Sequence, residues 1–318
     1  MIDQLNEYGE KRIPCFFMFD FELRQPLVLP LDRIDPGMLS FNFNGFESNR
    51  NSCPILSEIV IKKHPPGFDH YKAKFDRIHH HLRQGNSYLV NLTQPIPIEI
   101  NLTMDQIYHY GRAKYKLIYR NRFVFFSPEI FVRIYDDRIF TYPMKGTIDA
   151  TIPDAERKIL EDEKELAEHV TVVDLLRNDL STVARDVRVD RFRYLDLIRT
   201  PHRGLWQVSS MISGQLEPNW PARLGTILMS LLPAGSISGA PKPSTLRIIR
   251  DVEGYERGFY TGIAGVFDGR TLDSCVMIRF IENCGGQLMF KSGGGITVYS
   301  RAEAEYQEMV DKVDVPIC

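Results

Sequence analysis

The sequence predicts an α+β fold built from mostly antiparallel sheets. Predicted strands outnumber predicted helices, and the two do not alternate in the regular order of a doubly wound sheet. The apolar segments Ile130–Ile134 and Ile139–Tyr142 flank Asp136 and Asp137, which predicts a β-hairpin. A hairpin joins neighbouring antiparallel strands, so it supports the same fold class.

The composition is that of an ordinary globular protein. The 318 residues are 43% hydrophobic and 25% charged, enough for a sizeable core. Lys and Arg number 39 against 41 Asp and Glu, a net charge of −2, so no general basic surface for nucleic acid is expected. Since no long linker interrupts the chain, we expect one domain over 1–318, with a short strand-rich portion (1–67) before a core (68–318).

The cysteines and the N-terminus predict a reduced, cytoplasmic protein. The five cysteines are odd in number and form no C-x-x-C pair. The N-terminal sequence MIDQLNEYGEKR is polar, unlike a signal peptide, and no apolar run approaches the ~20 residues of a membrane span. We therefore expect no membrane association.

The first part of the chain predicts short strands and one helix. Strands are expected at Cys15–Phe21 and Leu27–Leu29, and a helix over Phe68–Arg83. The run His79–His81 cannot place three rings on one helical face, so a metal cluster there is not expected. Further strands are predicted at Tyr88–Leu92, Phe123–Phe126, Val266, Val276–Phe280 and Leu288–Phe290.

The later helices are predicted from apolar spacing and capping residues. A long helix is expected from Asp154 to Leu176 and another after Pro221. Ser300 and Glu303 form a capping-box pattern at the start of the final helix. Its buried stripe is predicted to be Tyr306, Met309, Val310 and Val313.

Two acidic pairs stand more than a hundred residues apart. They are Glu165 and Glu168 in KELAEH, and Glu305 and Glu308 in AEYQE. The i, i+3 spacing puts both carboxylates of a pair on one helical face, where like charges cost roughly 0.2–0.5 kcal/mol. Two such helices brought together would offer oxygen ligands to Mg²⁺. The alternative is two solvated acidic faces.

Lys145, in the segment PMKGT, ends a predicted strand and is a candidate nucleophile. A lysine there is usually a solvated charge, and its use as a nucleophile requires the neutral amine. Glu129 follows Ser127-Pro128 and leads into the predicted hairpin, so we expect its carboxyl group within reach of Lys145 as a proton donor. Together they could displace a poor leaving group such as hydroxide.

Three further segments are candidates for anion binding. Pro233–Lys242 is a loop of small residues that does not satisfy the phosphate-loop pattern. In Ser292–Ile296, Gly293, Gly294 and Gly295 predict a turn whose consecutive N–H groups could face an anion, although triple glycine is more often a flexible turn. Arg279 lies inside a strand-like apolar run and is expected to be buried with a carboxylate partner.

Eight motifs then stand in one order along the chain: SPE, PMKGT, KELAEHVTVVDLLRNDL, PAGSISGAPK, GFYTGIAG, MIRF, SGGGI and EAEYQE. In this order they closely resemble the chorismate-utilising enzymes over about residues 68–312. Among these, the resemblance is to aminodeoxychorismate synthase component I, which makes 4-amino-4-deoxychorismate for p-aminobenzoate and folate. It implies a chorismate-binding fold of two packed antiparallel sheets with outer helices.

The resemblance also implies roles for the candidate residues. Glu168 and Glu308 match Mg²⁺ ligands, and Glu165 and Glu305 match water-mediated or outer partners. The metal would bind the ring carboxylate of chorismate, with backbone amides of the glycine segment. The residues matched to substrate binding are Arg279, Tyr260 and the Gly295 amide at the enolpyruvyl carboxylate, Gly293 and Gly294 at the ring carboxylate, and Ser238 in place of a commoner threonine.

The choice among family activities depends on two positions. Anthranilate synthases resemble P-I-A-G-T, with alanine where Lys145 stands, whereas aminodeoxychorismate synthases have a lysine that attacks C2 as the C4 hydroxyl leaves. Glu129 matches the general acid. Isochorismate and salicylate synthases use a lysine base at the position of Leu89, which cannot act as a base. Gln207 stands where many relatives have histidine.

The resemblance implies amination of chorismate with ammonia from a separate glutamine amidotransferase, since no cysteine here has the sequence context of that nucleophile. Anthranilate synthase component I, isochorismate synthase and a non-catalytic chorismate-binding subunit are the alternatives. No counterpart of a tryptophan feedback pocket is found, so regulation by tryptophan is not expected.

Overall fold

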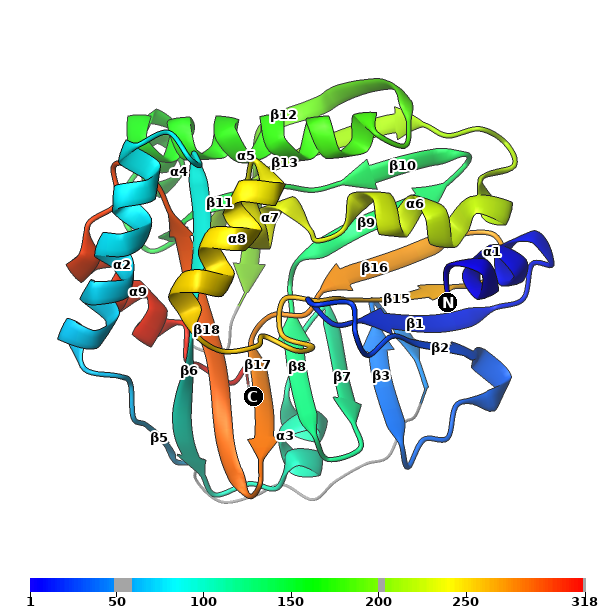
Figure 1. Cartoon of the computed structure of the whole chain (residues 1–318), viewed down its shortest axis with the longest axis horizontal. Coiled ribbons are helices and arrows are strands. Elements are labelled where there is room, and N and C mark those ends of the chain that lie inside the picture. The colour runs from blue at the N-terminus through cyan, green and yellow to red at the C-terminus, as the bar shows by residue number, and fades with distance from the viewer. Residues whose placement is uncertain (49–58, 200–203, 317–318) are drawn as a thin grey trace. The chain divides into compact units, whose positions relative to one another are not determined.

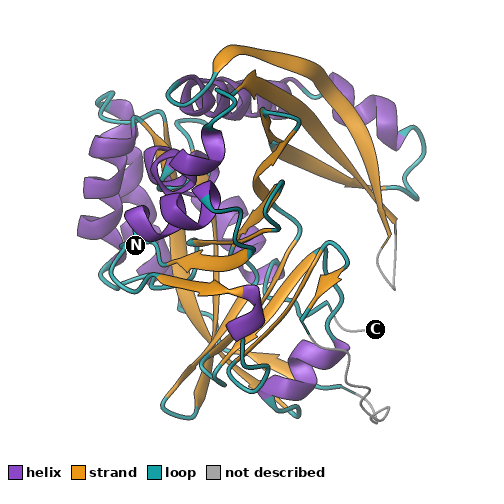
Figure 2. Ribbon diagram, turned by 90° about the vertical axis from the view of Figure 1, so that its right-hand side faces the viewer, coloured by secondary structure: helices purple, strands orange, loops and turns teal. Residues whose placement is uncertain are grey.

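The computed structural model describes residues 1–48, 59–199 and 204–316 (Figure 1). The chain divides into two compact units, each assembled from three separate segments. The first unit consists of residues 1–17, 129–236 and 265–275, and the second of residues 18–128, 237–264 and 276–318. Figure 2 shows that strands form the sheets and that helices cover them.

The first sheet has the order β11-β13-β10-β9-β16-β15-β1-β2, and β12 pairs with the other edge of β13. Its strands are β1 (Cys15–Phe19), β2 (Leu27–Pro30), β9 (Ile130–Tyr135), β10 (Arg138–Thr141), β11 (Met144–Asp149), β12 (Arg185–Arg199), β13 (Gly204–Gln215), β15 (Ile263–Phe267) and β16 (Leu272–Val276). The helices of the first unit are α1 (Ile2–Glu10), α4 (Ala155–Glu161), α5 (Glu163–Ser181), the 3-10 turn η2 (Trp220–Arg223) and α6 (Leu224–Leu231).

The second sheet has the order β14-β6-β18-β17-β8-β7-β3-β4, and β5 pairs with β6. Its strands are β3 (Leu39–Phe43), β4 (Phe46–Glu47), β5 (Ile61–Lys63), β6 (Leu89–Ile100), β7 (Tyr115–Tyr119), β8 (Phe123–Ser127), β14 (Gly239–Ala240), β17 (Phe280–Cys284) and β18 (Gln287–Ile296). The second unit also holds η1 (Leu31–Arg33), α2 (Phe68–Arg83), α3 (Met104–Tyr110), α8 (Lys242–Glu253) and α9 (Ala302–Asp311); the short α7 (Gly235–Ser238) joins the two units in sequence. The predicted α+β class, with antiparallel sheets flanked by helices, is confirmed.

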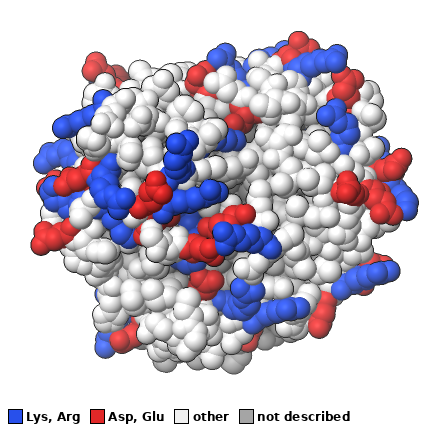
Figure 3. Space-filling model, in the orientation of Figure 1, with Lys and Arg blue, Asp and Glu red and all other residues white. Residues whose placement is uncertain are grey.

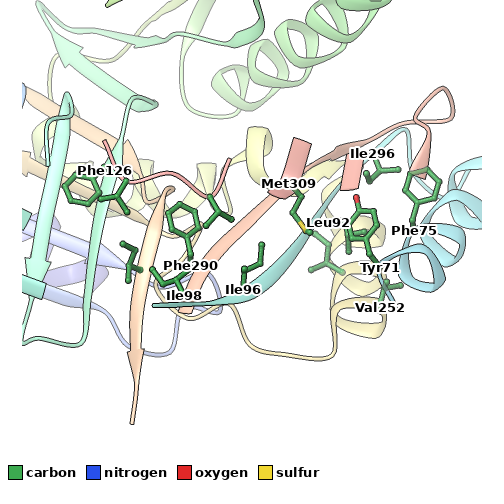
Figure 4. Close-up of a cluster of buried hydrophobic side chains, with 14 of the residues drawn as sticks. Tyr71, Phe75, Leu92, Ile96, Ile98, Phe126, Val252, Phe290, Ile296 and Met309 are labelled. Carbon is green, nitrogen blue, oxygen red and sulfur yellow. The ribbon is translucent and has the colours of Figure 1, made fainter. Parts of the chain in front are cut away.

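The core of the second unit lies between its sheet and three helices. Alternate residues of β6 face α2 and α8, and β18 contacts α9, because successive side chains of a strand point to opposite faces. The buried cluster joins Leu92, Ile96 and Ile98 of β6 and Phe290 and Ile296 of β18 to Tyr71 and Phe75 of α2, Val252 of α8 and Met309 of α9 (Figure 4). Of the predicted stripe of the final helix, Met309 and Val313 belong to this cluster, and Tyr306 and Val310 are partly buried against it.

β6 continues beyond the predicted end at Leu92, through two prolines. Pro95 pairs with Lys291 and Pro97 with Met289, both on β18. The Pro97 carbonyl accepts a hydrogen bond from the His64 N–H, so the missing N–H of each proline faces away from β18. A strand tolerates proline where the ladder needs no donor.

Local turn and cap chemistry explains the other agreements and differences. The β9–β10 hairpin forms as predicted, with positive φ angles of 49° at Asp136 and 54° at Asp137. The helix predicted over 154–176 is divided instead, because the Asp162 side chain accepts from the Glu165 N–H and begins α5. The predicted capping box is wrong: the Ser300 hydroxyl accepts from the Thr297 N–H, and α9 begins without a side-chain cap.

The surface agrees with the balanced charge of the sequence. On the face drawn in Figure 3, Lys and Arg are interspersed with Asp and Glu. None of the described helices is long and apolar enough to cross a membrane. Within the described residues, Cys15, Cys275 and Cys284 form no disulfide; Cys53 and Cys318 lie outside them.

The buried cluster predicts a large cost for Phe290→Ala. Phe290 is 1% exposed, so its truncation leaves a cavity and should lower the free energy of unfolding by about 3–5 kcal/mol. Tyr299, which is 76% exposed, is the control: Tyr299→Ala should change stability by no more than about 0.5 kcal/mol. Urea unfolding followed by circular dichroism measures both, and equal losses would contradict the assignment of the core.

Candidate active site

In the first unit, Lys145 lies on β11 against the acidic face of α5. Its Nζ is 2.7 Å from Glu168 Oε2, and the Glu168 side chain is only 9% exposed. Lys164, one turn earlier on α5, lies 3.7 Å from the other oxygen of Glu168. A carboxylate at this distance stabilises the ammonium form, whereas a nucleophilic lysine must be neutral. The structure therefore shows Lys145 in an ion pair.

Gly146 lets the second carboxylate of this helix approach the same strand. A Cβ at Gly146 would lie 2.8 Å from Glu165 Oε2, and Gly146 has a φ of +90°. Glu165 Oε2 is buried and has no hydrogen-bond partner. Desolvation raises the pKa of Glu165, Lys145 opposes that shift and Glu168 adds to it. We call these four residues the Lys145 cluster: Lys145, Gly146, Glu165 and Glu168.

His169 lies beside the Lys145 cluster and is fully buried. Its Nε2 is 2.7 Å from the Ser210 hydroxyl, which also accepts from the Arg193 N–H. Burial lowers the pKa of His169, and the Lys145 main-chain carbonyl acts in the opposite direction. The ring therefore connects α5 to β13, next to the strand that carries Lys145.

Glu129 is held by a residue distant in sequence. Its Oε1 accepts a hydrogen bond from the Ser236 hydroxyl, at the start of α7. Glu129 precedes β9, whereas β11, which carries Lys145, pairs with β13. The two residues therefore do not lie on paired strands, because β9 pairs with β10 while β10 and β11 pair with successive parts of β13.

In the second unit, the acidic face of α9 lies over Gly294 of β18. A Cβ at Gly294 would be 3.5 Å from Glu305 Oε2, 3.6 Å from Lys312 Nζ and 4.0 Å from Glu308 Oε1. Lys312 Nζ is 2.7 Å from Glu308 Oε1 and also donates to the Gly293 carbonyl. These residues form the Gly294 cluster: Gly294, Glu305, Glu308 and Lys312.

Gly293, Gly294 and Gly295 lie in a strand, so the predicted glycine turn is wrong. They pair with Thr93, Leu92 and Asn91 of β6. The Thr93 N–H and the Asn91 carbonyl are bonded away from β18, to Glu253 and Arg257.

In an antiparallel ladder, directly opposed residues both point their polar groups inward or both outward. The N–H groups of Gly293 and Gly295 therefore point away from β6, while that of Gly294 faces it. β17 pairs with β18 only from Gln287 to Lys291, so these two N–H groups lie on an edge that β17 does not cover. An anion could accept from both.

The remaining predicted substrate residues also belong to the second unit. Ser238 is fully buried at the end of α7, and Tyr260 is buried with its ring 6.0 Å from that of Phe280. Arg279 is exposed, with a φ of 49°, between β16 and β17. The predictions of a strand over Val276–Phe280 and of a buried Arg279 are wrong, because the chain turns at Arg279.

The carboxylates of the two clusters suit a hard cation. Glu165 has a buried oxygen without a donor, and a Cβ would fill the space beside the Glu305 and Glu308 oxygens at Gly294. No group of three or more His, Cys, Asp or Glu side chains that could hold a metal occurs among the described residues. Mg²⁺ is commonly bound by one or two carboxylates with water or substrate oxygens, so the donor set fits that ion.

Comparison with known proteins identifies the family. The sequence profile of a family described as "chorismate binding enzyme" matches residues 54–317. The chain belongs to the chorismate-binding enzymes.

Relatives of this chorismate-binding enzyme carry several names. An "uncharacterized PabA-like protein" of Haemophilus influenzae is 50% identical over 99% of the chain and 96% of the relative. Aminodeoxychorismate synthase component 1 of Escherichia coli is 29% identical over 77% of the chain, which spans 56% of that protein. Anthranilate synthase component I of Streptococcus pneumoniae has a similar structure, with a TM-score of 0.67 and 26% identity over 81% of the chain and 59% of that structure.

The structure also places three residues beside the candidate carboxylates that the sequence did not indicate. They are Ser236 at Glu129, His169 beside Glu168, and Lys312 at Glu308. Lys312 carries a signal that could have been used, because it follows Glu308 at the i, i+4 spacing of a helical ion pair. The other two depend on contacts between residues 41 and 107 positions apart.

The different surroundings of two neighbouring glycines predict different effects of alanine. A Cβ at Gly293 would lie 2.3 Å from the Leu92 carbonyl oxygen, so Gly293→Ala should cost about 1–3 kcal/mol of stability. At Gly294 the nearest atom would be 3.5 Å away, so Gly294→Ala should change stability by less than about 1 kcal/mol. Chemical denaturation measures the contrast; a larger loss for Gly294→Ala would show that the strand is misplaced.

Proposed function

We propose that this chorismate-binding enzyme is the aminating component of aminodeoxychorismate synthase, which converts chorismate and ammonia to 4-amino-4-deoxychorismate and water. One observation carries the proposal: a lysine, Lys145, lies on β11 within 2.7 Å of Glu168, on the acidic face of α5. Its amine is the group in the Lys145 cluster that can become a nucleophile. The family resemblance assigns a lysine at this position to the aminodeoxychorismate synthases.

The second unit supplies the contacts for the dianionic substrate. The N–H groups of Gly293 and Gly295 face outward on an uncovered strand edge, where they could bind carboxylate oxygens. Arg279 is exposed, so its guanidinium could donate two hydrogen bonds to a carboxylate in a bidentate pair. Tyr260 and Ser238 complete the proposed set of contacts.

In the proposed chemistry, Lys145 leaves its ion pair and loses its proton to water. The neutral amine attacks C2 of chorismate, both ring double bonds shift by one position, and the C4–O bond breaks. Glu129 donates a proton to the departing C4 hydroxyl group, which leaves as water. Ammonia then attacks C4, both double bonds shift back, and the C2–N bond to Lys145 breaks. The proton that the new ammonium group at C4 loses returns to Glu129, which restores the enzyme.

Magnesium and ammonia complete the proposal. Glu168 and Glu308, supported by Glu165 and Glu305, would hold Mg²⁺, which when bound would neutralise the ring carboxylate of the substrate. Ammonia would come from a separate glutamine amidotransferase subunit. The deciding experiment is incubation of the purified protein with chorismate, MgCl₂ and ammonium, with products identified by mass.

Anthranilate synthase component I is the second candidate. A relative with that name in Arthrobacter globiformis is 36% identical over 60% of the chain. Those enzymes resemble P-I-A-G-T, without a lysine at position 145, and formation of anthranilate in the same assay would favour this candidate. Isochorismate synthase requires a base near Leu89, which is apolar, buried and beside Gly295.

Lys145→Ala should reduce amination of chorismate by more than about 100-fold, because it removes the covalent step. Lys164→Ala is the matched control, since Lys164 also faces Glu168 but is 56% exposed and lies 3.7 Å away. The control should retain near-normal turnover. Steady-state assays with ammonium measure both variants, and wild-type turnover by Lys145→Ala would remove the nucleophile from the mechanism.

Mg²⁺ should raise the melting temperature, whether or not turnover is observed. A ligand at a hundred times its Kd stabilises the folded state by about 2.7 kcal/mol. Glu308→Gln, which alters the Gly294 cluster, should weaken the shift, while Glu303→Gln, exposed on the same helix, should not. Thermal shifts across a MgCl₂ titration test this, and identical curves for the two variants would exclude Glu308 as a ligand.

A further inference from the structure

Arg257 is the largest fully buried side chain among the described residues, and every one of its side-chain N–H donors is used. Its Nε and Nη2 donate to the two oxygens of Glu253 at 2.9 and 2.7 Å. Nη1 donates to the Ile237 carbonyl and the Thr261 hydroxyl, and Nη2 also donates to the Asn91 carbonyl. These contacts account for all five donors of a guanidinium group.

The Glu253–Arg257 ion pair bonds main-chain groups on the edge of β6 that faces away from β18. Glu253 Oε1 accepts from the Thr93 N–H at 2.8 Å, and Arg257 donates to the Asn91 carbonyl at 2.8 Å. Thr93 and Asn91 are the residues of β6 paired with Gly293 and Gly295. The ion pair therefore satisfies main-chain polar groups of the two β6 residues that are paired with Gly293 and Gly295.

The same guanidinium stabilises an unusual backbone conformation beside Tyr260. Thr261 has a φ of 61°, which is rare for a β-branched residue and costs energy. Its hydroxyl accepts from Arg257 and donates to the Tyr260 carbonyl at 2.6 Å. The Arg257 contact therefore helps to fix the chain direction at Tyr260.

The third contact fixes the end of α7. The Ile237 carbonyl, 2.9 Å from Arg257 Nη1, directly precedes Ser238. Gly239 follows with a φ of 123°, and a Cβ there would lie 1.8 Å from the Leu89 carbonyl oxygen. Arg257 therefore contacts three segments, two of them distant from it in sequence, and each carries or pairs with a residue of the proposed substrate site.

We propose that Arg257, anchored by Glu253, is a positioning residue that sets the mutual geometry of the chorismate contacts at Gly293, Gly295, Tyr260 and Ser238. The inference rests on the proposed function, because it assigns those residues to substrate binding. The planar guanidinium group can donate to two main-chain carbonyls and the Thr261 hydroxyl at once. The single ammonium group of a lysine cannot reach all three acceptors. Arg257 touches no substrate itself.

The test is Arg257→Lys, which keeps the charge beside Glu253 but loses the planar guanidinium group. We expect a folded protein whose kcat/KM for chorismate falls by about 10- to 100-fold, mainly through a higher KM, because small misplacements of binding groups carry costs of that size. Lys116→Met is the matched control: it removes two hydrogen bonds to the Tyr108 and Gly111 carbonyls, neither of which belongs to a proposed chorismate contact. The control should lose stability without a change in KM.

Combination with Thr261→Val separates positioning from general destabilisation. Thr261→Val removes the hydroxyl that links Arg257 to Tyr260, so the effects of the two substitutions on KM should be strongly non-additive in a double-mutant cycle. A normal KM in Arg257→Lys, or additive effects in the cycle, would overturn the inference. If the wild-type protein itself does not bind or convert chorismate, the proposed function fails instead, so the two failures are distinguishable.

Discussion

A carboxylate can approach a strand closely only where the strand carries no side chain. Glu165 over Gly146 of β11 meets this constraint, because a Cβ there would lie 2.8 Å from its Oε2. Glu305 lies over Gly294 of β18, where a Cβ would lie at 3.5 Å, an ordinary contact distance. A Cβ at either glycine would occupy space beside a carboxylate oxygen. The oxygens are thereby held against the sheet and partly removed from water, which makes them costly unless a cation is near.

Each cluster provides one such cation from its own unit. Lys145 pairs with Glu168, and Lys312 pairs with Glu308, at 2.7 Å in both cases. Glu165 still has a buried oxygen without a donor, so the compensation in the first unit is incomplete. This remaining need for positive charge is the physical basis for proposing a divalent ion, and it explains why a near-neutral protein could hold a dianionic substrate.

Much of the local structure was predictable because it depends on neighbouring residues. The helix over Phe68–Arg83, the hairpin around Asp136 and the buried stripe of the final helix follow from apolar spacing and turn chemistry. The errors have two sources. A competing local contact changed the start of α9, because Ser300 bonds Thr297 instead of capping the helix. A distant contact changed the glycine segment, because β6 provides β18 with a strand partner.

The sequence by itself determined the family, the acidic pairs and the lysine, because these are encoded in ordered motifs and in helical spacing. Only the tertiary structure decided that Gly293 and Gly295 direct their N–H groups outward while Gly294 does not, since that alternation is set by pairing with β6. The structure also decided that Arg257 unites Asn91, Ile237 and Thr261. Hydrogen bonds between residues up to 166 positions apart leave no pattern in a single sequence, because folding alone brings them together.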